Sequence, residues 1–69
     1  MGKGDELKEQ GLKLHQQHDY EAAARLFQQA QEAYDAEDVE DMSAEMMVNI
    51  GVIHRILGEN QQALDAMQG

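Results

Sequence analysis

The fold is decided by residues 7–30, which read LKEQGLKLHQQHDYEAAARLFQQA. Apolar residues recur at helical spacing on either side of a polar interruption, among them Leu7, Leu12, Leu14, Tyr20, Ala23, Ala24, Phe27 and Ala30. Apolar residues three and four apart lie on one face of an α-helix. The interruption, His18-Asp19, ends the first helix, and the Asp19 side chain can accept a hydrogen bond from the N–H groups that open the next one. The stretch predicts two helices, over about 5–17 and 20–36, joined by a tight turn.

The composition of the whole chain also favours helix. Its 69 residues contain no Pro and few aromatic residues, and it is rich in unbranched side chains, which lose little rotamer freedom in a helix. Since there is no Cys, neither a disulfide nor a thiolate metal site can staple the fold. Stability must therefore come from helix packing or from a partner. We expect an all-α fold in a single domain over residues 1–69.

The second half predicts two more helices. After the acidic run 35–41, apolar residues again recur at helical spacing: Met42, Met46, Met47, Ile50, Ile53 and Leu57. They predict a third helix over about 39–57. Gly58 can end this helix in the left-handed conformation, and Asn60 can cap a fourth over 61–68, which is about two turns. The expected architecture is two antiparallel helix-turn-helix hairpins, with the fourth helix short.

The two halves of the chain align at a constant offset of 40 residues. The matched pairs are Leu7 with Met47, Gly11 with Gly51, Leu14 with His54, Tyr20 with Asn60, Ala23 with Ala63, and Phe27 with Met67. Small residues at Gly11 and Ala23 let the two helices of a hairpin approach closely, and Gly51 and Ala63 would do the same in the second. Two copies of one helical hairpin explain the alignment.

This order of bulky apolar residue, small residue, tight turn, Ala, aromatic residue and Ala resembles the tetratricopeptide repeat family. The resemblance implies one repeat over about 4–36 and a second, incomplete at its C-terminus, over about 39–68. The chain departs from the family in its 40-residue offset, against a usual period of about 34 residues. It also lacks the Pro between units, and Leu14, His54 and Met67 stand at positions usually aromatic.

In this family the first helix of each repeat lines a concave groove that holds a peptide or helix of a partner protein. The resemblance therefore implies a non-catalytic adaptor or scaffold that binds another polypeptide. The residues it places in the groove, and that we predict to bind the partner, are Lys8, Leu12, His15, Asn49, Val52, Arg55 and Ile56.

One subgroup of the family grips a C-terminal carboxylate. Lys8 and Asn49 match two of the residues that this subgroup uses, but Leu12 stands where it has an Asn, and its third repeat is absent. Most of the hydrogen-bond donors that would bind the two carboxylate oxygens are therefore missing. We therefore expect a groove of mixed character with an apolar middle rather than a carboxylate grip.

Self-association is the alternative function. Because the second repeat is incomplete, it leaves apolar residues at Ile56, Leu64 and Met67 that a second copy of the chain could cover. The chain would then be a structural module that completes its core as a homo-oligomer.

Other classes of function lack support in the sequence. The net charge of −9 disfavours nucleic acid and anionic membrane surfaces as partners. No apolar run approaches the roughly 18 residues of a membrane span, so we expect a cytoplasmic protein. There is one Ser, no Cys and no Gly-rich phosphate loop, so we expect neither an enzyme nor a cofactor.

Two places in the sequence carry residue types that can bind a metal ion. His15 and His18 are three apart and could share a helix face with Asp19, but a surface pair at a helix end is the favoured interpretation. The acidic run 35–41 lacks the Gly and the bidentate Glu of a calcium loop, which excludes an EF-hand. We expect no metal, and we expect the His54 ring to pack inside the second hairpin.

Overall fold

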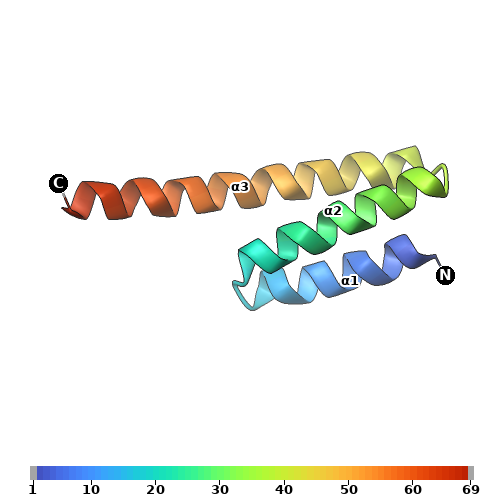
Figure 1. Cartoon of the computed structure of the whole chain (residues 1–69), viewed down its shortest axis with the longest axis horizontal. Coiled ribbons are helices and arrows are strands. Elements are labelled where there is room, and N and C mark those ends of the chain that lie inside the picture. Colours follow the sequence, from blue (N-terminus) through green and yellow to red (C-terminus); the bar gives the residue numbers. More distant parts are fainter. Residues whose placement is uncertain (1, 69) are drawn as a thin grey trace.

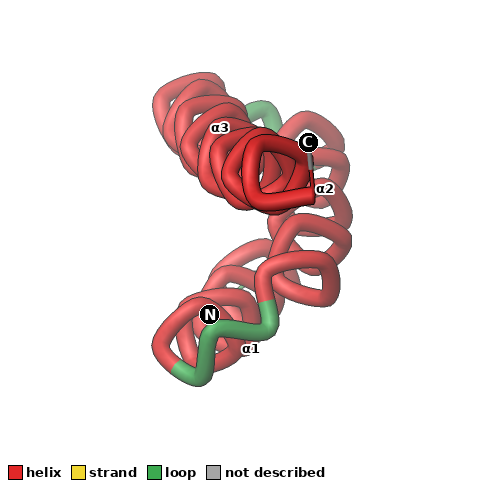
Figure 2. The backbone as a smooth tube through the Cα atoms, turned by 90° about the vertical axis from the view of Figure 1, so that its left-hand side faces the viewer, coloured by secondary structure: helices red, strands yellow, loops and turns green. Residues whose placement is uncertain are grey.

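The structure, a computed structural model, describes the backbone of residues 2–68 and the side chains of residues 2–59. It contains three helices: α1 (Lys3–Gln16), α2 (Tyr20–Ala36) and α3 (Glu40–Gln68). Consecutive helices run antiparallel, with α1 packed on α2 and α2 packed on α3 (Figure 1). The end-on view shows an arc with α2 at its bend and α1 and α3 on the same side (Figure 2). The all-α prediction is confirmed, and no strand occurs among the described residues.

The two turns between the helices have the same construction. His18 and Asp38 each adopt a left-handed conformation with φ 64°. In the first turn the Asp19 N–H donates to the Leu14 carbonyl at 2.9 Å, and the second turn repeats this bond from the Val39 N–H to the Tyr34 carbonyl at 2.9 Å. Both bonds satisfy carbonyls that the end of a helix leaves without partners. The backbone therefore closes these turns, and the prediction of an Asp19 side-chain cap is wrong, since that side chain makes no capping hydrogen bond.

The core lies along α2. Its buried apolar side chains are Ala23, Phe27, Ala30 and Tyr34 from α2, and Met46 and Ile53 from α3. On α1 the buried positions are the glycines Gly4 and Gly11. A Cβ on Gly4 would lie 2.7 Å from the Tyr34 ring, and one on Gly11 would lie 2.8 Å from the Phe27 ring. The close approach expected at Gly11 is therefore made by an aromatic ring lying on the α1 backbone.

The predicted fourth helix is not present as a separate element. Helix α3 continues through Gly58 to Gln68, and no Gly in the described residues has a positive φ. A Gly inside a helix costs only about 1 kcal/mol relative to Ala, and the Gln, Ala, Leu and Met residues that follow are good helix formers. The second hairpin is therefore not confirmed. None of the helices that the structure describes is both long and apolar enough to cross a membrane.

Side-chain hydrogen bonds connect the helices where α1 and α3 begin and α2 ends. The Ser43 hydroxyl of α3 donates to Asp35 of α2 at 2.5 Å, and the Tyr34 hydroxyl donates to Asp5 of α1 at 2.5 Å. Burial of Tyr34, together with its hydrogen bond to the Asp5 carboxylate and the charge of that group, raises the pKa of the Tyr34 phenol above its ordinary value of about 10. The free energy of unfolding should therefore fall at alkaline pH, where the unfolded chain loses the Tyr34 proton more readily than the folded chain.

Above about pH 10 the free energy of unfolding of Tyr34→Phe is expected to fall less than that of the wild type. Since the unfolded chain releases the phenol proton at about pH 10 and the folded chain only at higher pH, stability from this group is complete below about pH 10 and falls above it. The free energy of unfolding, measured by urea titration from about pH 8 to 11, would show this. Tyr20→Phe, which retains Tyr34, is the control, and equal alkaline losses in Tyr34→Phe and the wild type would contradict the assignment.

Candidate functional site

A small pocket opens on the concave side of the arc. It has a volume of about 140 Å³ and is lined by all three helices: Leu12 and His15 of α1, Phe27 of α2, and Asn49 and Val52 of α3. Phe27 is only 1% exposed and forms the floor. An apolar floor with one imidazole and one amide at its walls can hold an apolar side chain and offer hydrogen bonds around it.

Local sequence explains how these side chains meet. Because Gly11 has no side chain, the Phe27 ring lies directly against α1, beside the neighbouring residue Leu12. On α3, Asn49 and Val52 are three residues apart and therefore share a helix face. The Gly11–Phe27 contact thus sets both the floor of the pocket and the position of its α1 wall.

Exposed apolar surface surrounds the pocket. Leu12 is 41% exposed, Val52 is 46% exposed, and Val48, one turn before Val52 on α3, is 65% exposed. Single exposed apolar residues are ordinary on protein surfaces, but here two of the three line the same pocket. Leu12 and Val52 thus give the concave side an exposed apolar surface around the pocket.

The structure brings together four of the seven predicted partner-binding residues: Leu12, His15, Asn49 and Val52. It leaves the other three outside the pocket. Lys8 is half-buried on α1, Ile56 is half-buried on α3, and Arg55 is exposed and pairs with Glu59 at 3.2 Å. Since Lys8 does not line the pocket with Asn49, the two residues that match a carboxylate grip are not gathered there. The Leu64 and Met67 side chains lie outside the described residues.

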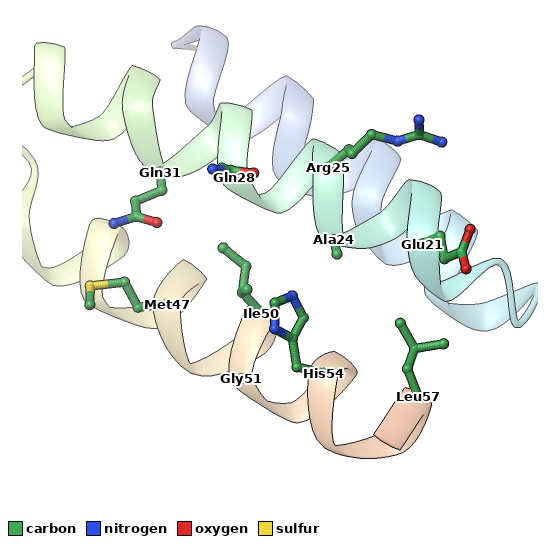
Figure 3. Close-up of a pocket in the computed structure, with 10 residues that line it drawn as sticks. All are labelled: Glu21, Ala24, Arg25, Gln28, Gln31, Met47, Ile50, Gly51, His54 and Leu57. Carbon is green, nitrogen blue, oxygen red and sulfur yellow. The ribbon is translucent and has the colours of Figure 1, made fainter. Parts of the chain in front are cut away.

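A second and larger groove of about 640 Å³ lies between α2 and α3 (Figure 3). Its walls are Glu21, Ala24, Arg25, Gln28 and Gln31 of α2, and Met47, Ile50, Gly51, His54 and Leu57 of α3. Two predictions fail here. His54 is exposed rather than packed inside a hairpin, and a Cβ on Gly51 would meet nothing within 4 Å. Both predictions required a fourth helix over this groove, and α3 continues straight instead.

The histidines at the end of α1 gather around one aromatic ring. The His18 Nδ1 atom lies 2.8 Å from the Tyr20 hydroxyl, and the His15 ring meets the Tyr20 ring edge to face with centroids 5.3 Å apart. Among the described residues, no group of three His, Cys, Asp or Glu side chains is placed to hold a metal ion. Tyr20 thus orients His15, which also forms part of the concave pocket.

Comparison with known proteins gave no match. No protein-family model matches the chain, and no match was found among curated proteins or among solved structures.

Proposed function

We propose that this chain is a non-catalytic protein–protein interaction module of the tetratricopeptide type. It binds a peptide or helix of a partner on its concave side, between α1 and α3, as a cytoplasmic adaptor or scaffold. The observation that carries the proposal is the meeting of Leu12, His15, Asn49 and Val52 over the Phe27 ring. The seating of that ring on Gly11 supports the repeat assignment, because the pattern has a small residue at the place of Gly11 and an aromatic residue at that of Phe27.

The pocket constrains what the partner offers. A volume of about 140 Å³ accommodates one apolar side chain, which would lie on Phe27 between Leu12 and Val52. His15 and Asn49 are then placed to hydrogen-bond the polar backbone on either side of that anchor. The net charge of −9 favours a basic partner, because opposite charge raises the association rate and like charge opposes it. The expected ligand is a segment with one apolar anchor and basic flanks.

Val52→Glu is expected to weaken the binding of such a segment by at least about 100-fold, because the bound apolar anchor would cover a carboxylate that is in water in the free chain, at a cost of about 3 kcal/mol. The measurement begins with a random peptide library selected on the wild-type chain. Peptides that bind are then titrated against variants by fluorescence anisotropy. Met47→Glu is the matched control, because Met47 is an exposed apolar residue of the same helix that lines the other groove.

The two variants distinguish peptide binding in the concave pocket from peptide binding in the α2–α3 groove. Selected peptides should carry an apolar residue flanked by Lys or Arg, bind Met47→Glu as they bind the wild type, and bind more weakly as salt increases. A selection that yields no binding peptide contradicts the proposal. Peptides that lose affinity for Met47→Glu but not for Val52→Glu would place binding on the α2–α3 groove.

A further inference from the structure

Helix α3 carries a second stripe, which faces the α2–α3 groove. Met47, Ile50, His54 and Leu57 line that groove at intervals of three, four and three residues. In the sequence the same spacing continues at Gln61, Leu64 and Gln68, where the backbone is still helical. Residues with this spacing stay on one face over many turns, as in paired helices.

The stripe continues along α3 beyond the ends of α1 and α2. Leu57 shares the groove with Glu21, which lies in the first turn of α2. Beyond that point α3 extends past the ends of α1 and α2, with no other described helix alongside it (Figure 1). One half of the stripe therefore borders an open groove, and the other half has no neighbouring helix within the described part of its own chain.

We propose that the α2–α3 groove holds α3 of a second copy of this chain, running antiparallel, with the two-fold axis near Leu57. Ile50 and Leu64 each lie seven residues from Leu57 in the sequence. A two-fold axis at Leu57 therefore places Ile50 of each copy opposite Leu64 of the other, and Leu57 opposite its own equivalent. The same surface then serves both copies, as a closed two-fold dimer requires.

The dimensions suit a second copy. The overlap of Met47 to Gln68 is about 33 Å of helix, along which each chain offers the seven residues of its stripe and the five α2 residues that line the groove. Cβ atoms on Gly51 or Gly58 would meet nothing within 4 Å, so these positions leave room for a helix to approach closely. The same chain cannot fill its own groove with Leu64, because Ile50 and Leu64 are about 21 Å apart along one continuous helix.

Cysteine pairs test the proposal directly, because the chain has no Cys of its own. The test variant is Ile50→Cys with Leu64→Cys, equilibrated in a glutathione redox buffer and resolved by non-reducing electrophoresis and mass spectrometry. The proposal predicts a covalent dimer with two disulfides between chains. The control is Val48→Cys with Val52→Cys, two exposed positions that do not line this groove and that should form little disulfide-linked dimer under the same conditions.

Two outcomes overturn the proposal. A disulfide between the two introduced cysteines of one test chain would mean that the C-terminal part of α3 folds back onto its own groove. Dimer formation no greater than in the control pair would mean that the groove has no such occupant.

Light scattering on chains without cysteine is the second test. The wild type is expected at twice 7.7 kDa, and Leu64→Glu is expected at 7.7 kDa with its helical circular dichroism retained. Because each copy carries a charge of −9, raising the salt should strengthen the dimer, whereas it should weaken the binding of a basic peptide. Val52→Glu should lose the peptide but keep the dimer. The two proposals can therefore fail separately, and a wild type that stays at 7.7 kDa at high concentration and salt refutes this one.

Discussion

Phe27→Ala is expected to destabilise the fold by about 3–5 kcal/mol, the cost of truncating a buried Phe. Its ring is 1% exposed and lies directly on α1, where a Cβ on Gly11 would come within 2.8 Å of it. Without the ring, α1 would face a cavity that its glycine cannot fill. A chain of 69 residues has a total stability of only about 3–10 kcal/mol, so the variant should lose a large share of it and unfold at a much lower urea concentration than the wild type.

The loss is measured by urea unfolding followed by circular dichroism, with Gln29→Ala as the control. Gln29 is an exposed residue of the same helix, and its replacement should change the free energy of unfolding by less than about 0.5 kcal/mol. Phe27→Leu, which keeps part of the buried volume, should fall between the two. A Phe27→Ala variant that unfolds at the same urea concentration as the wild type would refute the packing of α1 on α2 described above.

Ile53→Asp is expected to unfold the chain, whereas Val52→Asp should leave it folded. The two residues are neighbours on α3, but Ile53 is 0% exposed against α2 and Val52 is 46% exposed on the concave side. An uncompensated buried carboxylate costs about 3–5 kcal/mol, while a carboxylate at an exposed position remains in water. The difference in the free energy of unfolding should thus be about 3 kcal/mol or more.

This pair tests which face of α3 packs against α2. Helical circular dichroism and thermal unfolding of the two variants provide the measurement. If Val52→Asp unfolds and Ile53→Asp does not, α3 is rotated about its axis from the orientation described here. The concave pocket and the α2–α3 groove would then have other linings.

The first hairpin was predictable in detail because its signals are local. The apolar spacing of α2 set its bounds at Tyr20 and Ala36, as observed. Gly11 indicated a close approach, which the Phe27 ring makes. The residues that adopt the left-handed conformation in the turns were harder to predict. His18 and Asp38 carry the left-handed conformations although neither is Gly, since the bonds that close each turn come from the backbone.

The second half was less predictable because its signals are ambiguous. Gly58 has the properties of a helix terminator, but a Gly without a following Pro also fits inside a helix at modest cost. Alignment of Gly51 with Gly11 predicted a packed contact, and the structure shows an open groove there instead. On the concave side, four of the residues that the resemblance selected line one pocket. The spacing of residues within a helix could not show that Lys8, Arg55 and Ile56 lie outside the pocket. The lining of the pocket depends on how far apart α2 holds α1 and α3.

We expect a partner segment to bind over Phe27 between α1 and α3. The most direct test is a ¹H–¹⁵N NMR titration of the labelled chain with a peptide selected on it. The largest shift changes are expected at Leu12, His15, Asn49 and Val52, with nuclear Overhauser contacts between the Phe27 ring and the apolar anchor of the peptide. Changes confined to the residues of the α2–α3 groove, or no contact to Phe27, would contradict it.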